Sequence, residues 1–158
     1  MRCMRNSKES RLHETNFVDS EKMWLYFRSE LPGYVSIYLL DENRKANIIV
    51  PYSGDSNLYR VEANKDYAFV DDGDKNNTLY NSIILNALEH LVVNHVYVMF
   101  SPHAFGSIST NPGQSDIKSG NYLPRNCSDK EFLKWLSQRR VADRDMSVVD
   151  FPIFIDAK

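Results

Sequence analysis

Residues 33–71, GYVSIYLLDENRKANIIVPYSGDSNLYRVEANKDYAFVD, decide the fold class of this chain. Short runs rich in Val, Ile, Leu and Tyr are separated by tight polar turns, and this pattern is typical of a compact antiparallel sheet. We therefore predict four short strands in this stretch, which cover residues 34–40, 45–50, 57–61 and 66–70.

The first of these strands carries apolar side chains on both of its faces. Because successive side chains on a strand point to opposite faces, Val35 and Ile37 share one face, whereas Tyr34 and Tyr38 share the other. The turn before this strand ends at Gly33, for which we predict the positive φ of a type II bend.

Further strands are predicted outside this stretch. Residues 23–28 alternate with a period of two, and residues 92–100 carry bulky side chains on both faces, which is typical of a central strand. Residues 149–155 form the last alternating strand. Pro152 favours an edge position for it, because proline has no amide hydrogen to donate to a ladder.

Three segments have less regular patterns. Residues 1–20 are polar and are predicted to be a flexible leader, with ordered structure beginning near residue 21. Residues 79–91 fit either a helix or a strand, and we favour a strand over residues 80–86. Residues 101–122 are rich in Gly, Ser, Thr and Asn, which predicts a long loop.

A helix is predicted over residues 128–140. Ser128 is a natural N-cap, and Glu131 three residues later completes a capping box. Cys127 and the fourth helical residue occupy the two positions of a hydrophobic staple. The apolar face of the helix consists of Phe132, Trp135 and Leu136.

Together these elements predict a mainly β (α+β) fold. We expect an antiparallel β-sandwich or rolled sheet, with one helix in the C-terminal half packed on it. A chain of 158 residues is typical of about one domain. The predicted organisation is therefore a flexible leader over residues 1–20 and a single β-rich domain over residues 21–158.

Composition and charge argue against several classes of protein. The net charge is −2 and the cations are scattered, so we expect no nucleic-acid partner. No apolar run approaches the roughly 20 residues that cross a bilayer, and the first residues lack the apolar core of a signal peptide. We expect a soluble chain without an export signal. Cys3 and Cys127 define no framework and leave the compartment open.

Candidate metal ligands are present but poorly spaced. Asp72, Asp74 and Asn76 have the alternate spacing of a calcium loop, but Ile83 stands where the bidentate acid is expected, so we interpret the segment as a solvated turn. No zinc-like spacing connects the remaining candidates, which are His90, His95 and His103. We therefore predict no metal site and no cofactor.

If the protein is an enzyme, the residues favour a hydrolase that uses His103 or Cys127. The chain lacks a Gly-x-Ser-x-Gly elbow and a phosphate-binding glycine loop. The staple position of Cys127 favours a packing role. We predict that the protein is not an enzyme and keep the hydrolase as an alternative.

Two surfaces are candidates for binding. Tyr34, Tyr38, Tyr59 and Tyr97 are candidates to line an exposed face that meets a glycan or a lipid. The loop over residues 101–122 is the other, because long loops in compact domains are often functional. The candidate binding residues of this loop are Ser101, His103, Phe105, Asn111, Asp116 and Tyr122.

The order of these motifs resembles a known family. PGYVSIYLL followed by IIVPY is similar to the opening hairpin of domain of unknown function family 4384, and NKDY and VYVMFSP are similar to its later elements. These motifs stand at residues 32–40, 48–52, 64–67 and 96–102. Residues 123–136 resemble a C-terminal extension of Bacteroides-type members, and the whole resemblance covers roughly residues 22–156.

The resemblance implies a noncatalytic domain of bacterial proteins that are often exported or envelope-associated. Some such domains are fused to caspase-like peptidase or kinase modules, and the family has no catalytic residues to carry over. The resulting hypothesis is a noncatalytic interaction module that binds a protein partner, for which the resemblance implies an envelope or periplasm setting. A ligand-binding β-sandwich for glycan or lipid and a hydrolase are the alternatives.

Overall fold

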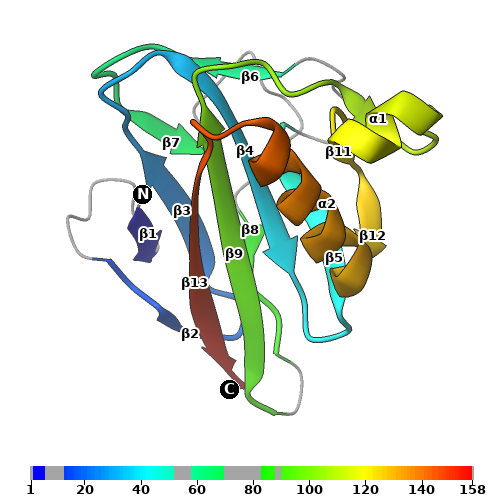
Figure 1. Cartoon of the computed structure of the whole chain (residues 1–158). Helices are drawn as coiled ribbons and strands as arrows, with labels where there is room; N and C mark the ends of the chain where they lie inside the picture. Colours follow the sequence, from blue (N-terminus) through cyan, green and yellow to red (C-terminus); the bar gives the residue numbers. More distant parts are fainter. Residues whose placement is uncertain (1, 6–12, 52–57, 70–82, 88–89, 158) are drawn as a thin grey trace.

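The chain folds into a β-rich α+β structure, shown in Figure 1. In this computed structural model, strands make up most of the regular secondary structure of the described residues, together with two helices. The predicted fold class is therefore confirmed, although the chain has a second helix that the sequence did not indicate. The residues that the structure describes are 2–5, 13–51, 58–69, 83–87 and 90–157.

The larger sheet forms the centre of the molecule. Across the described residues it has seven strands in the order β12-β5-β4-β9-β13-β2, with β6 paired to β4 beyond this path. All neighbours are antiparallel except β13 and β2, which are parallel. The strands are β2 (Asn16–Val18), β4 (Gly33–Leu40), β5 (Lys45–Val50), β6 (Tyr59–Val61), β9 (Val92–Ser101), β12 (Asn126–Ser128) and β13 (Ser147–Asp156).

The smaller sheet covers one face of the larger one. Its order is β1-β3-β7, and β8 also pairs with β3. Met23 and Leu25 of β3 pack in one apolar cluster with Val35 and Ile37 of β4, so the two sheets form a sandwich. The strands are β1 (Arg2–Arg5), β3 (Lys22–Phe27), β7 (Tyr67–Phe69) and β8 (Ile83–Ile84).

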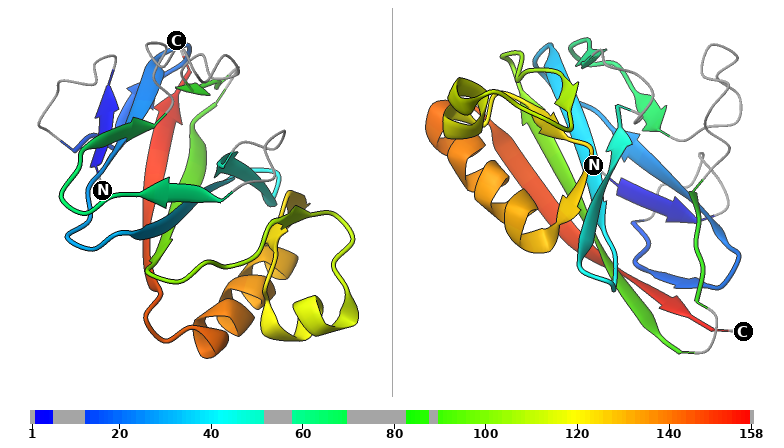
Figure 2. Two further views of the ribbon diagram at one scale, coloured as in Figure 1. Left: turned by 90° about the horizontal axis from the view of Figure 1, so that it is seen from above. Right: turned by 90° about the vertical axis from the view of Figure 1, so that its right-hand side faces the viewer.

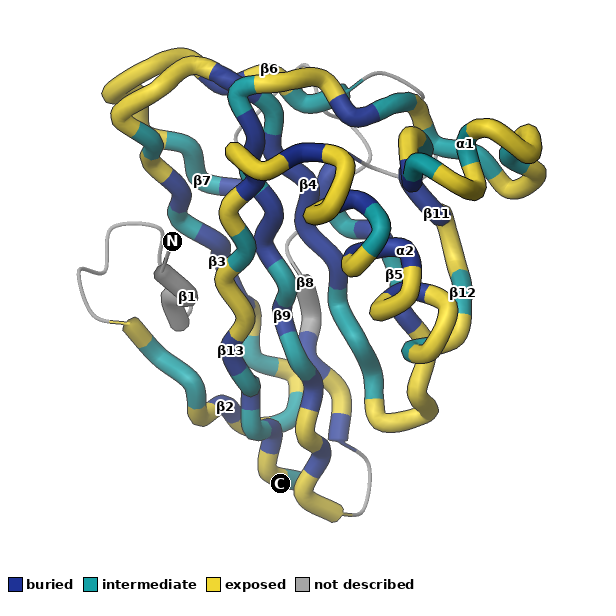
Figure 3. The backbone as a smooth tube through the Cα atoms, in the orientation of Figure 1, coloured by how far each residue is buried: buried dark blue, intermediate teal, exposed yellow. Residues whose placement is uncertain are grey.

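Helix α2 (Asp129–Ala142) covers the opposite face of the larger sheet, as Figure 2 shows. Ser128 accepts a hydrogen bond from the Glu131 amide, and the Glu131 carboxylate accepts one from the Ser128 amide, so the predicted capping box is confirmed. Figure 3 shows buried positions, in dark blue, along α2. They are the three predicted apolar residues together with one cation. These side chains are Phe132, Trp135, Leu136 and Arg139.

The alternation within the strands follows the sequence closely. Val35 and Ile37 of β4 lie in the cluster between the sheets, and Tyr38 lies in the cluster beneath α2. Strand β9 pairs with β4 on one side and β13 on the other, so its predicted central position is confirmed. Pro152 lies beyond the part of β13 that β2 reaches, and no described strand pairs with it on that side. The edge position predicted for this strand is therefore wrong, because β13 lies between β9 and β2, although the short β2 leaves Pro152 itself unpaired on that side.

The leader predicted over residues 1–20 is wrong where the structure describes it. Strand β1 pairs with β3, and β2 pairs with the end of β13. Phe17 of β2 is only 2% exposed and belongs to the core. Strands of three or four residues among polar neighbours are too short to produce a recognisable period, which is why the sequence did not reveal them.

Gly33 is required for a reason other than the predicted one. It is the first residue of β4, it is buried, and it does not have a positive φ. A Cβ atom at this position would collide with the Ser101 carbonyl oxygen and would lie 2.8 Å from the Phe100 ring. Close packing of β4 against β9, and not a type II bend, therefore excludes a side chain here.

The two ambiguous segments also differ from expectation. Within residues 80–86, only Ile83–Ile84 is a strand, residues 85–86 have no regular structure, and residues 80–82 lie outside the described part. Residues 101–122 are not a plain loop, because they contain β10 (Ile108–Ser109) and α1 (Gln114–Ser119). Strand β10 pairs in parallel with β11 (Leu123–Pro124). Helix α1 buries no residue, so its sequence has no apolar period from which a helix could be predicted.

Candidate functional site

The segment over residues 101–122 is anchored along α2. Phe105 is fully buried, and the Arg139 guanidinium lies 5.7 Å from the centre of its ring. Trp135 Nε1 donates to the carbonyl oxygens of Gly120, at 3.1 Å, and Tyr122, at 2.5 Å. These contacts hold the segment in one position against the helix, so the space between them is preformed.

That space is a groove with a volume of about 350 Å³, within the roughly 300–1,000 Å³ range of ligand pockets. It lies between the α1 region and α2, and we call it the α2 groove. Its lining combines apolar and aromatic surface with two cations and one carboxylate. The residues that matter most to its chemistry are Ile117, Tyr122, Arg125, Glu131, Lys134 and Trp135.

The charges in the α2 groove differ in their availability. The Glu131 carboxylate accepts hydrogen bonds from the backbone amide and the hydroxyl of Ser128, which lower its pKa. Arg125 and Lys134 are exposed and have no ion-pair partner among the described residues. The groove therefore presents free positive charge although the chain as a whole carries a net charge of −2.

The structure separates the candidate loop residues that the sequence singled out. Tyr122 lines the groove, and burial, followed by the nearby Cys127 and Glu131, raises its pKa. Asn111 and Asp116 lie outside the groove lining, and Asp116 accepts a hydrogen bond from the amide of Gly113 at the start of α1. Ser101 and Phe105 are buried and unavailable to a partner, whereas His103 is exposed at another site.

The sequence does not single out Arg125, which carries no motif. Lys134 belongs to a group of cations on and after the predicted helix, for which a solvated helix face is favoured over contact with an anionic partner; the group is Lys130, Lys134, Arg139, Arg140 and Arg144. Lys134 lies on α2, on the side that faces α1, and Arg125 lies between β11 and β12. Arg125 follows Tyr122 by three residues, whereas Lys134 becomes a neighbour of Tyr122 only because the 101–122 segment packs on α2.

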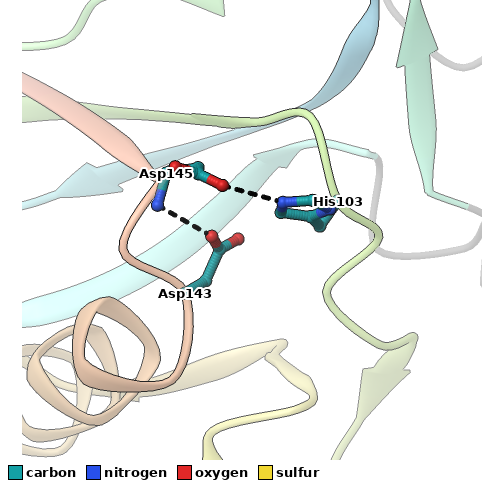
Figure 4. Close-up of side chains that lie close together, drawn as sticks. All are labelled: His103, Asp143 and Asp145. Carbon is teal, nitrogen blue, oxygen red and sulfur yellow. Dashed lines mark hydrogen bonds and ion pairs between the residues drawn. The ribbon is translucent and has the colours of Figure 1, made fainter.

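A second cluster lies at the C-terminal end of α2, as Figure 4 shows. His103 Nε2 lies 3.0 Å from Asp145 Oδ2. One ligand atom from each of His103, Asp143 and Asp145 lies within 4.8 Å of the other two. We call these three residues the His103 cluster. His103 and Asp145 are exposed, whereas the Asp143 side chain is only 4% exposed.

Asp143 is held in place by hydrogen bonds from three directions. The buried Ser101 hydroxyl donates to its Oδ2, and the Arg139 guanidinium donates to the same oxygen at 3.3 Å. The Asp145 amide donates to Oδ1 at 3.1 Å. Ser101 Oγ also accepts the His103 amide at 3.0 Å, which fixes the turn that carries the imidazole.

In this geometry, His103 does not lie beside a serine hydroxyl or a cysteine thiol that it could activate. The Ser101 hydroxyl is buried and donates to a carboxylate, so no imidazole is placed to activate it. Cys127 precedes the first turn of α2, whereas His103 contacts a residue beyond its last turn. A helix of 14 residues is about 21 Å long, so His103 and Cys127 are too far apart to react together.

Cys127 is also a poor nucleophile on its own. Burial, followed by the charge of Glu131, raises the pKa of the Cys127 thiol to about 11. Since the thiolate is the reactive form, Cys127 is almost wholly unreactive at neutral pH. Its place in the apolar cluster beneath α2 agrees with the predicted packing role.

The four tyrosines expected to line one exposed face do not form such a face. Tyr38 is fully buried beneath α2, and its hydroxyl donates to the Pro124 carbonyl at 2.6 Å. Tyr34 and Tyr97 pack beside that cluster, whereas Tyr59 packs in the cluster between the sheets. The tyrosine-rich face predicted for glycan or lipid is therefore wrong.

The remaining candidate ligands do not converge. His90 pairs with Glu42 at 3.0 Å, beyond the start of β9, whereas His103 lies beyond its end. A strand of ten residues is about 30 Å long, which keeps the two imidazoles apart. The possible calcium ligands at residues 72–76 lie outside the described residues.

Among the residues that the structure describes, no helix combines the length and the apolar character needed to span a bilayer. No family model, no curated protein and no solved structure matches this chain, so the resemblance to domain of unknown function family 4384 stays a prediction.

Proposed function

We propose that this chain is a noncatalytic interaction module that binds an acidic, extended segment of a partner protein in the α2 groove. The observation that carries the proposal is the free positive charge of Arg125 and Lys134 beside the aromatic surface of Tyr122. The envelope setting that the family resemblance implies stays a prediction.

The groove suits a peptide because its walls are already in place. The bonds from Trp135 to the carbonyls of Gly120 and Tyr122 order the loop before any partner arrives. Binding to a preformed surface avoids the entropy cost of ordering a mobile loop. The exposed side chain of Ile117 adds apolar area at the opposite wall.

The charge of the groove selects the chemistry of the occupant. Three charged side chains line it, two cationic and one anionic, and the anion already accepts hydrogen bonds from Ser128. An acidic segment with an aromatic or aliphatic side chain therefore complements both features of the surface. A basic segment would be repelled by Arg125 and Lys134.

Fluorescence polarisation with labelled peptides tests this proposal. The probes are a set of about ten-residue peptides that combine Asp or Glu with Leu, Phe or Tyr, each with a matched peptide in which Lys replaces the acids. We expect the acidic peptides to bind more tightly, with an affinity that falls as salt is added. Lys134→Glu should weaken binding by about tenfold or more.

Lys130→Glu is the matched control, because it reverses the same charge on the same helix outside the groove lining. It should leave the peptide affinity unchanged. Equal binding of acidic and basic peptides, or equal effects of the two variants, would contradict the proposal. Binding of neutral glycans or lipid vesicles in place of every peptide would also overturn it and favour a ligand-binding sandwich.

A further inference from the structure

We propose that His103, Asp143 and Asp145 form a binding site for one divalent transition-metal ion, such as Zn²⁺ or Mn²⁺. One imidazole and two carboxylates match the ligand preferences of these ions, which accept both nitrogen and oxygen donors. The site is separate from the α2 groove, whose lining includes none of the three residues.

The distances within the His103 cluster are close to those of a coordination sphere. Two donors bound to one Zn²⁺ at about 2.1 Å each lie about 3.0–3.4 Å apart. His103 Nε2 and Asp145 Oδ2 are already 3.0 Å apart, and no pair in the cluster exceeds 4.8 Å. The exposed side chains of His103 and Asp145 can close the difference by small rotations towards the buried Asp143.

Asp143 retains acceptor capacity for an ion. Each carboxylate oxygen has two lone pairs. Ser101 and Arg139 occupy those of Oδ2, whereas the Asp145 amide occupies one of the two on Oδ1. One position on Oδ1 remains available, and the three donors hold it in a fixed orientation. Hydrogen bonds of this kind around a ligand are typical of metal sites.

The charges favour a cation. Arg139 balances Asp143 through their buried ion pair. Asp145 then supplies a second carboxylate, which has no Lys or Arg partner among the described residues and lies next to the His103 imidazole. A divalent ion bound here would have three protein ligands and open positions towards solvent, because His103 and Asp145 are 61% and 69% exposed.

The fold brings these residues together through the pairing of β9 with β13. Phe100 near the end of β9 lies opposite Ser147 at the start of β13. The segments that follow β9 and precede β13 must therefore lie side by side, with His103 on one and Asp145 on the other. The metal-free alternative is a solvent-exposed ion pair between these two residues, which contributes little to stability.

Metal titration of the full chain distinguishes a metal-binding site from a metal-free ion pair between His103 and Asp145. The protein should carry no histidine tag, and Cys3→Ser should be the common background so that a sequence-remote thiol does not bind zinc. After treatment with a chelator, ZnCl₂ and MnCl₂ are titrated by calorimetry, and the melting temperature is recorded with and without each ion. We expect one ion per chain and a higher melting temperature when the ion is bound.

His103→Ala and Asp145→Asn should each weaken binding by about a hundredfold and abolish the thermal shift. His90→Ala is the matched control, because His90 is also exposed and paired with a carboxylate, yet lies beyond the other end of β9. It should bind as the parent does. Asp143 is not substituted, because that would leave the buried Arg139 without its partner.

Two results would overturn the proposal. The first is the absence of saturable binding at ion concentrations up to about 1 mM, an affinity too weak to matter. The second is binding that survives His103→Ala or is lost equally in His90→Ala. Either result would leave the His103 cluster as an ordinary surface ion pair.

Discussion

Removal of the Trp135 side chain tests the contact on which both the helix and the α2 groove depend. Trp135 is 1% exposed, and its ring lies 5.7 Å from that of Tyr38 and 5.8 Å from that of Phe132. Its Nε1 also holds the carbonyls of Gly120 and Tyr122. Trp135→Ala therefore removes packing and two hydrogen bonds at once.

The expected cost is large for a single substitution. Replacement of a buried Trp by Ala typically lowers the free energy of unfolding by about 3–5 kcal/mol, because a cavity remains. The two carbonyls lose their donor, which adds about 1 kcal/mol if water does not replace it fully. For a chain of this length, at about 3 °C per kcal/mol, the melting temperature should fall by roughly 10–20 °C.

Urea unfolding followed by circular dichroism measures this cost, and two further variants divide it. Trp135→Phe keeps most of the ring but loses the donor, so it should cost less than Trp135→Ala while still loosening residues 120–122 and weakening peptide binding. Leu133→Ala, at a position 45% exposed on the same helix, should change the unfolding free energy by less than about 0.5 kcal/mol. A Trp135→Ala variant that unfolds like the parent would refute the docking of α2.

Three further predictions follow from local geometry. Gly33→Ala should lower the free energy of unfolding by about 1–3 kcal/mol, because the new Cβ would collide with β9. Thermal unfolding measures this loss, and an unchanged melting temperature would contradict the close packing of β4 against β9. Ser128→Ala should lower the free energy of unfolding by about 1 kcal/mol at pH 7, because it removes the N-cap of α2. The hydrogen bonds from Ser128 lower the folded-state pKa of Glu131, so its contribution to stability is present above the unfolded pKa and is lost as the pH falls through the folded pKa. The difference in unfolding free energy between the parent and Ser128→Ala, measured by urea unfolding, should therefore narrow below about pH 4. A difference that stays constant with pH would count against the capping box. In a Cys3→Ser background, Cys127 with its pKa of about 11 should react with iodoacetamide at pH 8 about a hundredfold more slowly than a free thiol; equal rates would show that the thiol is not buried.

The sequence by itself determined the elements whose patterns are local. Val35 and Ile37 alternate with Tyr34 and Tyr38, and this period of two was enough to place β4 and assign its faces. The capping box at Ser128 located the start of α2 to the residue. Local patterns are reliable here because burial and capping act within a few residues along the chain.

The short elements could not be predicted from local sequence patterns. Strand β2 spans three residues, and α1 buries none of its side chains, so neither contributes a period. Both are held by contacts with segments far away in the sequence: β2 pairs with the end of β13, and the Gly120 carbonyl that follows α1 accepts a bond from Trp135. Tertiary contacts, and not local propensity, account for both.

The candidate sites depend on the tertiary structure almost entirely. His103 and Asp145 are 42 residues apart and meet only because β9 and β13 pair in one particular register. Alternation tells which face a side chain occupies, but a register shifted by two residues would preserve every face and move these residues apart. Arg125 and Lys134 likewise become a binding surface only when the 101–122 segment packs on α2. Strand register and loop packing are set by contacts between distant segments, so no stretch of the sequence encodes them alone.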